Sequence, residues 1–204
     1  MHRTTSRRRA AVLAPVLGLA LAVSAALPAS AASTTGSDAR GDVVKRDRDA
    51  STQDAEVPAP RNQTADITRL TVRRGEHRVR IIVGIRDLRP STRGLALDDV
   101  DYRIRTPEGD FTARVSSDRR GQRLRTSEGL AEPSGFDAGC SGLTSRHLYR
   151  RDVVRLVIPN RCLGHPRWVR VGAQTFRSTR DRTFVDDALA EGRIFDRPRL
   201  GPRT

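Results

Sequence analysis

The sequence predicts an all-β protein, a single antiparallel β-sandwich of the jelly-roll or immunoglobulin-like kind that is closed by one disulfide. Three observations lead to this fold class. Several short segments place an apolar residue at every second position, which is the period of a half-buried strand. Turn residues such as Gly, Pro, Asn and Asp separate these segments. No window of useful length carries the 3.6-residue apolar stripe of an amphipathic helix.

The start of the chain is typical of an exported protein. Residues 1–31 combine a group of arginines, an uncharged apolar run over 10–27, and the small residues Ala29-Ser30-Ala31. This is the order of a cleavable signal peptide, so we expect a secreted, extracellular protein without membrane contact after cleavage. A retained membrane anchor is the alternative interpretation of the same run.

Two compositional features follow the signal segment. Residues 32–62 are rich in Ser, Thr, Asp and Pro, which predicts a flexible spacer, and within it "GDVV" fits a short edge strand. The whole chain has 38 basic and 24 acidic residues, and Lys45 is its only lysine. Such a preference for Arg is typical of GC-rich coding sequences, so the net charge is weak evidence for a nucleic-acid partner.

The sandwich domain is expected over 63–204, and it opens with two hairpins. In "ADITRLTVRRGEHRVRIIVGIRDL", Leu70 and Val72 share a face, 74–77 form a turn, and apolar alternation returns over 79–85. The same pattern recurs over 100–115, around a turn at Pro107-Glu108-Gly109-Asp110.

The later segments are less regular. A weaker strand is predicted at "QRLRT", followed by a Gly/Pro/Ser loop over 127–139. "DVVRLVIP" and "RWVRVGAQTF" are strong strands, and Pro159 ends the first because it cannot donate to a ladder. One helical turn is predicted at 187–191, before a tail rich in Pro and Arg.

The two cysteines, Cys140 and Cys162, are expected to form a disulfide. An even number of cysteines in an exported domain favours a bridge, which here would fasten the irregular loop to the sheet. A zinc site that adds His147 and His165 is the alternative. The many arginines around these residues disfavour it, because they repel a divalent cation.

Arginines also suggest a partner. The candidate anion-binding residues are Arg146, Arg150, Arg151, Arg167 and Arg170. They predict contact with an anionic wall polymer, an acidic polysaccharide or extracellular DNA, in a manner that salt weakens. Only 4% of the residues are aromatic, which argues against a dedicated nucleic-acid binder because base stacking needs exposed rings.

Clusters of aspartates are the remaining candidates for chemistry. They are Asp98, Asp99 and Asp101, then Asp186 and Asp187, and finally Asp38 and Asp42. Paired carboxylates serve either a glycoside hydrolase or a calcium site. No nucleophile elbow, zinc-protease motif, phosphate loop or EF-hand pattern occurs. A hydrolase therefore stays open as an alternative to a binding protein, and no cofactor other than calcium is expected.

The segments "GDV", "ADITRL", "DVVRLVIPNRCLGHPRWVRVG" and "FVDDA" resemble small secreted actinobacterial proteins of unknown function. More remotely, the Asp-rich start is similar to DOMON-like and family-9-type carbohydrate-binding sandwiches. That resemblance implies a two-sheet sandwich with calcium near Asp38, Asp42, Asp186 and Asp187. The leading expectation is a secreted, non-catalytic β-sandwich at or outside the cell envelope; a calcium-stabilised carbohydrate-binding module is an alternative.

Overall fold

The computed structural model describes residues 31–47, 56–90, 99–118, 121–128, 140–179, 181–190 and 198–204. The predicted signal segment up to residue 30, Asp98 and most of the predicted loop at 127–139 lie outside these ranges. No helix in the described part is long and apolar enough to cross a membrane.

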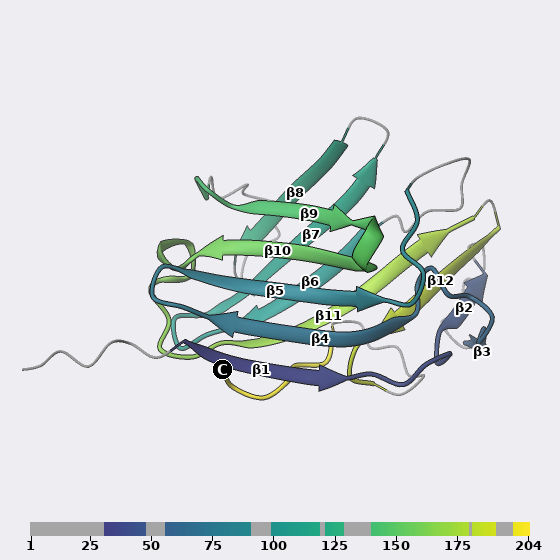
Figure 1. The fold of residues 1–204 in the computed structure, drawn as a ribbon, viewed down its shortest axis with the longest axis horizontal. Coiled ribbons are helices and arrows are strands. Elements are labelled where there is room, and N and C mark those ends of the chain that lie inside the picture. Colours follow the sequence, from purple (N-terminus) through teal and green to yellow (C-terminus); the bar gives the residue numbers. More distant parts are fainter. Residues whose placement is uncertain are drawn as a thin grey trace, which may run out of the picture.

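Two antiparallel sheets, one in front of the other, form the described part of the protein (Figure 1). The first sheet consists, in spatial order, of β1 (Ala32–Ser37), β4 (Ile67–Arg74), β5 (Arg78–Ile85), β10 (Val153–Pro159) and β9 (Thr144–Leu148). The second consists of β3 (Val57–Pro58), β2 (Val44–Asp47), β12 (Arg182–Asp187), β11 (Arg170–Ser178), β6 (Asp99–Arg105), β7 (Asp110–Asp118) and β8 (Gly121–Glu128). The predicted all-β antiparallel sandwich is confirmed. Two 3-10 turns, η1 (Tyr149–Arg151) and η2 (Asn160–Leu163), complete the described elements.

The core lies between the sheets, where the predicted period-two residues meet. In the first sheet Val72 pairs with Ile81 across the β4–β5 hairpin, and both are buried. In the second sheet Ile104 of β6 pairs with Val171 of β11, and both are buried. Removing one such side chain from water stabilises the fold by about 1.5–3 kcal/mol.

The N-terminal segment differs from the spacer that its composition predicts. β1 pairs with β4 as an edge strand of the first sheet, and β2 pairs with β12 in the second sheet. The physical reason is that an edge strand has a neighbouring strand on one side only, so it buries little apolar surface. The inward positions Thr34 and Gly36 are small, and Leu189 comes within 3.2 Å of where a Cβ on Gly36 would lie. The chain therefore crosses from one sheet to the other between Ser37 and Val44.

The C-terminal segment also differs from the prediction. Instead of a helical turn at 187–191, Ala188–Ala190 form a tight turn, with the Ala190 N–H donating to the Asp187 carbonyl. Residues 198–204 then lie along β11. Thr204 and Val169 exchange backbone hydrogen bonds of 2.9 and 3.1 Å, so this segment continues the ladder beside β11.

The predicted disulfide between Cys140 and Cys162 is present, with a Cα–Cα distance of 5.7 Å. It fastens the end of the 127–139 loop to η2, directly after β10. Closing a chain segment of this length stabilises a fold by about 3 kcal/mol in the chain-entropy treatment. Because both sulfurs are in this bond, the zinc alternative with His147 and His165 is wrong.

Candidate metal centre

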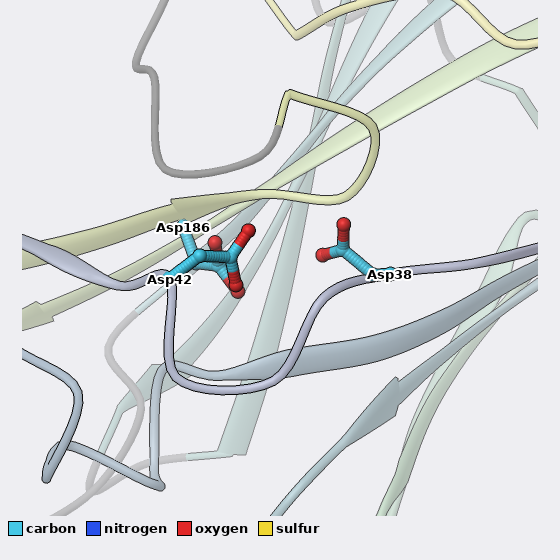
Figure 2. Close-up of side chains that lie close together, drawn as sticks. All are labelled: Asp38, Asp42 and Asp186. Atoms are coloured by element: carbon cyan, nitrogen blue, oxygen red, sulfur yellow. The ribbon is translucent and has the colours of Figure 1, made fainter.

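Three aspartates far apart in the sequence converge where the chain crosses between the sheets. Asp38 and Asp42 lie on the turn between β1 and β2, and Asp186 lies on β12 (Figure 2). One carboxylate oxygen from each residue lies within 4.8 Å of one from each of the others. The structure thus brings together three of the four residues that the sequence assigned to calcium.

The turn between β1 and β2 is shaped by backbone hydrogen bonds. The Asp38 N–H donates to the Thr68 carbonyl at 3.1 Å, which ends the pairing of β1 with β4. Gly41 has a φ of +78°, in the left-handed region that glycine enters without a steric penalty. Its N–H donates to Asp66 Oδ2 at 3.0 Å, so Asp66 helps to fix the turn.

Asp186 points into the sandwich. It pairs with Thr175 of β11, which is fully buried, and its own side chain is only 1% exposed. Oδ2 accepts a hydrogen bond of 2.6 Å from the N–H of Ile67, at the start of β4. Oδ1 is buried and has no hydrogen-bond partner among the described residues. A buried carboxylate oxygen without a partner destabilises the folded state, so we expect this carboxylate either to carry a proton or to bind a cation.

Asp66 is a fourth carboxylate at this place, and sequence reasoning missed it. It is 0% exposed; Oδ2 also accepts from Arg86 Nη1 at 3.2 Å, while Oδ1 is buried without a partner in the described part of the chain. The preceding loop is fixed by Asn62, whose Oδ1 accepts the Ala65 N–H at 3.1 Å. The signal available in the sequence was an acidic residue directly before a strand that is buried from its first position, Ile67.

The electrostatics of the cluster favour a bound cation. Burial raises the pKa of Asp38 to about 9, with further contributions from the charges of Asp186 and Asp42. Burial likewise raises the pKa of Asp186 to about 8, and here Asp42 is the largest charged contributor. Neither Asp38 nor Asp186 forms an ion pair with any residue that the structure describes. Without a cation these groups must hold protons near neutral pH.

Asp187 does not belong to the cluster, although the sequence placed it there beside Asp186. Successive residues of a strand point to opposite faces, so the two carboxylates diverge. Asp187 accepts hydrogen bonds from Gln174 Nε2 at 3.0 Å and from the Arg199 N–H at 3.2 Å. Burial raises its pKa, and these two donors lower it in part. Its role in the structure is to hold the C-terminal segment.

The other acidic candidates lie on the outward face of the second sheet. Asp101 of β6 accepts two hydrogen bonds of 2.6 Å from the guanidinium of Arg114 on β7. Asp99 lies on the same strand face and opposite Ser116. These residues form an ordinary cross-strand charge arrangement, and a paired arginine occupies the carboxylate that a hydrolase would need.

The five predicted anion-binding arginines lie on several different elements. Arg146 is exposed on β9, while Arg150 and Arg151 are exposed in η1. Arg167 is exposed in the loop before β11. Arg170 is engaged by the C-terminal segment, because its Nε donates to the Gly201 carbonyl at 2.7 Å.

A pocket of about 420 Å³ opens beside the cluster. Asp38 lies on its wall, together with Arg170 and Arg199 from the side of the C-terminal segment. Asp38 is half-buried whereas Asp186 is fully buried. Of the three carboxylates, Asp38 is thus the one that lines the pocket.

Comparisons with known proteins give no match to the chain from any family model, curated protein or solved structure.

Proposed function

We propose that the protein is an exported, non-catalytic β-sandwich module, acting at or outside the cell envelope, whose fold is completed by one calcium ion. The observation that carries this proposal is the cluster of Asp38, Asp42 and Asp186, with its oxygens within 4.8 Å of one another. Oδ1 of Asp186 supports it, because this atom is fully buried and no residue that the structure describes gives it a hydrogen bond.

The type of ligand atom favours calcium among the common cations. All ligand atoms of the cluster are carboxylate oxygens, with no His or Cys among them. Hard oxygen ligands suit calcium and magnesium, whereas zinc and copper prefer nitrogen or sulfur. Calcium accepts irregular sets of six to eight oxygens, and magnesium requires a near-ideal octahedron. Three carboxylates from a turn and a strand suit the more tolerant ion.

The hydrolase alternative is less compatible with the geometry. Glycosidases hold their two carboxyl groups about 5–5.5 Å apart when retaining and about 6.5–9.5 Å apart when inverting. Both arrangements require the carboxyl groups to reach the substrate, and Asp186 at 1% exposure is out of reach of a sugar. Asp101, which the sequence offered as a second candidate, is paired with Arg114.

The position of the cluster gives the ion a structural role. Asp38 and Asp42 lie on the turn that leaves the first sheet, and Asp186 lies on β12 of the second sheet. An ion bound by all three fastens this turn to β12 and neutralises their mutual repulsion. A module of this kind needs no catalytic group, and its activity is carried by its outer surfaces.

Thermal unfolding of the exported chain in a calcium chelator and in excess calcium tests the proposal. At a calcium concentration 100-fold above Kd, binding to the folded state adds about 2.7 kcal/mol of stability. For a domain of this size that corresponds to a rise in Tm of roughly 5–10 °C. Magnesium should give a smaller rise at equal concentration. An unchanged Tm with calcium, or a larger shift with zinc, contradicts the proposal.

A further inference from the structure

The outward face of the first sheet carries arginines and no acidic residue. Because side chains alternate along each strand, the register of β1, β4, β5, β10 and β9 defines which residues point away from the core. We call this surface the basic face; its arginines are Arg69, Arg73, Arg78, Arg80, Arg146 and Arg155. Figure 1 looks onto this sheet, and no labelled element lies in front of it.

The arginines of the basic face have no counter-ion within the described residues. None of the six forms an ion pair there. The outward face of the second sheet is different, because Arg114 pairs with Asp101, and both Arg103 and Arg105 pair with Asp110. A uniform preference for Arg in the composition does not account for this difference between the two faces.

Like charges lie directly opposite each other at two places on the basic face. Arg73 of β4 pairs in register with Arg80 of β5, and Arg155 of β10 pairs with Arg146 of β9. Directly opposed like charges destabilise a sheet. An anionic group between the two guanidiniums of a pair removes that repulsion, and it accepts forked, charge-assisted hydrogen bonds.

The two arginine pairs are spaced for an extended ligand. They are separated by two strand spacings across the sheet and by one two-residue step along it. With strands about 4.8 Å apart and about 3.4 Å per residue, the centres of the pairs lie roughly 12 Å from each other. Between them lie Ile82 of β5 and Val157 of β10, so the surface between the two pairs carries no charge. A linear chain with recurring anionic groups fits this arrangement.

The composition of the face identifies the class of partner. No outward residue of the first sheet is aromatic, so the bases of a nucleic acid have no ring to stack on. The large exposed apolar side chains of the described residues are Val57 and Tyr149, neither on this face, which leaves nothing to insert into a membrane. We propose that the basic face binds a linear acidic polysaccharide through its carboxylates. This binding involves none of the calcium ligands.

Binding of hyaluronan to the exported chain, measured by calorimetry in calcium-containing buffer, tests this proposal. The carboxyl methyl ester of the same polymer is the uncharged control. The double variant Arg73→Gln/Arg155→Gln removes one arginine from each pair. A matched variant, Arg61→Gln/Arg203→Gln, removes the same charge from exposed loop positions outside the basic face.

We expect the basic-face variant to bind hyaluronan at least tenfold more weakly, and the matched variant less than twofold more weakly. The methyl ester should not bind, and affinity should fall steeply between 50 and 200 mM salt. The Tm of the basic-face variant should stay equal or rise, since a repulsion between arginines is removed.

Equal losses of affinity in both variants would show that only net charge matters, which contradicts the proposal. Binding of the ester, or tighter binding of duplex DNA or polyphosphate at the same salt, would also overturn the proposal. The calcium-dependent Tm is read on the same samples, so failure of one proposal is distinguished from failure of the other.

Discussion

The N–H of Ile67 donates a 2.6 Å hydrogen bond to Asp186 Oδ2 across 119 residues of sequence. This contact joins the start of β4 in the first sheet to β12 in the second. It occupies one oxygen of Asp186, while the other, Oδ1, is buried and has no hydrogen-bond partner among the described residues. The side chain that makes this contact between the sheets is also the most buried of the three carboxylates, so binding of the proposed ion would be coupled to the stability of the sandwich.

Asp38→Asn separates the effect of charge from that of the cation. Asp38 is half-buried and makes no ion pair with a described residue, so the amide fits the same space. In chelator at pH 8 we expect the Tm of the variant to exceed that of the wild type, because the cost of a buried carboxyl group disappears. In calcium we expect the rise in Tm to fall by at least half, because one ligand charge is lost.

Asp101→Asn is the matched control for this substitution. It removes an acidic charge from the outward face of the second sheet, where Asp101 pairs with Arg114. Its calcium-dependent rise in Tm should equal that of the wild type. If Asp38→Asn lowers Tm in chelator and leaves the calcium response intact, Asp38 is not a ligand.

The pH dependence of stability without calcium has a defined sign. The pKa values of Asp38 and Asp186, about 9 and about 8, lie above the value near 3.9 of an unfolded chain. The folded state therefore binds more protons than the unfolded state between these limits, so stability falls as pH rises. In chelator we expect Tm to decrease steadily from pH 5.5 to pH 9.

Calcium should reverse this trend, because the ion displaces protons from the carboxyl groups and binds more tightly as pH rises. Thermal unfolding across the pH series, with and without chelator, measures both effects. In Asp38→Asn the decrease without calcium should be shallower, since one of the groups with a raised pKa is gone. A Tm in chelator that rises from pH 7 to pH 9 is the contrary result.

The sequence predicted those elements in which the local pattern of apolar and polar residues matches the pattern of buried and exposed positions. The β4–β5 and β6–β7 hairpins were predictable because buried positions such as Val72 and Val100 alternate with polar ones. β1 was not, because an edge strand with small inward residues has the composition of a spacer. Its place depends on pairing with β4, which no local pattern reports.

The site was predictable only in part, for a related reason. Asp38, Asp42 and Asp186 were visible as acidic clusters, but whether Asp186 or its neighbour Asp187 points inward depends on the register with β11. Asp66 has no acidic neighbour in the sequence, so no local cluster indicated it. The basic face was hidden as well, because Arg73 and Arg155 become neighbours of other arginines only through strand pairing.

Gly172 lies where the C-terminal segment comes closest to the sheet, and this contact predicts the effect of a single methyl group. A Cβ at this position would lie 2.2 Å from the carbonyl oxygen of Arg199, which no side chain tolerates without movement. In Gly172→Ala the segment must therefore leave β11, which removes the hydrogen bond from the Gly201 N–H to the Val171 carbonyl. Asp187 loses the Arg199 N–H at the same time.

We expect Gly172→Ala to lower the free energy of unfolding by about 1–3 kcal/mol, the usual cost of inserting a methyl group where there is no room. Trypsin should also cut after Arg199 and Arg203 at least tenfold faster than in the wild type, as measured by mass spectrometry over time. Gly75→Ala is the matched control, because its Cβ would meet only the Arg78 carbonyl oxygen, at an ordinary 3.6 Å. Equal rates of cleavage in the two variants would mean that the segment is not held over Gly172 in solution.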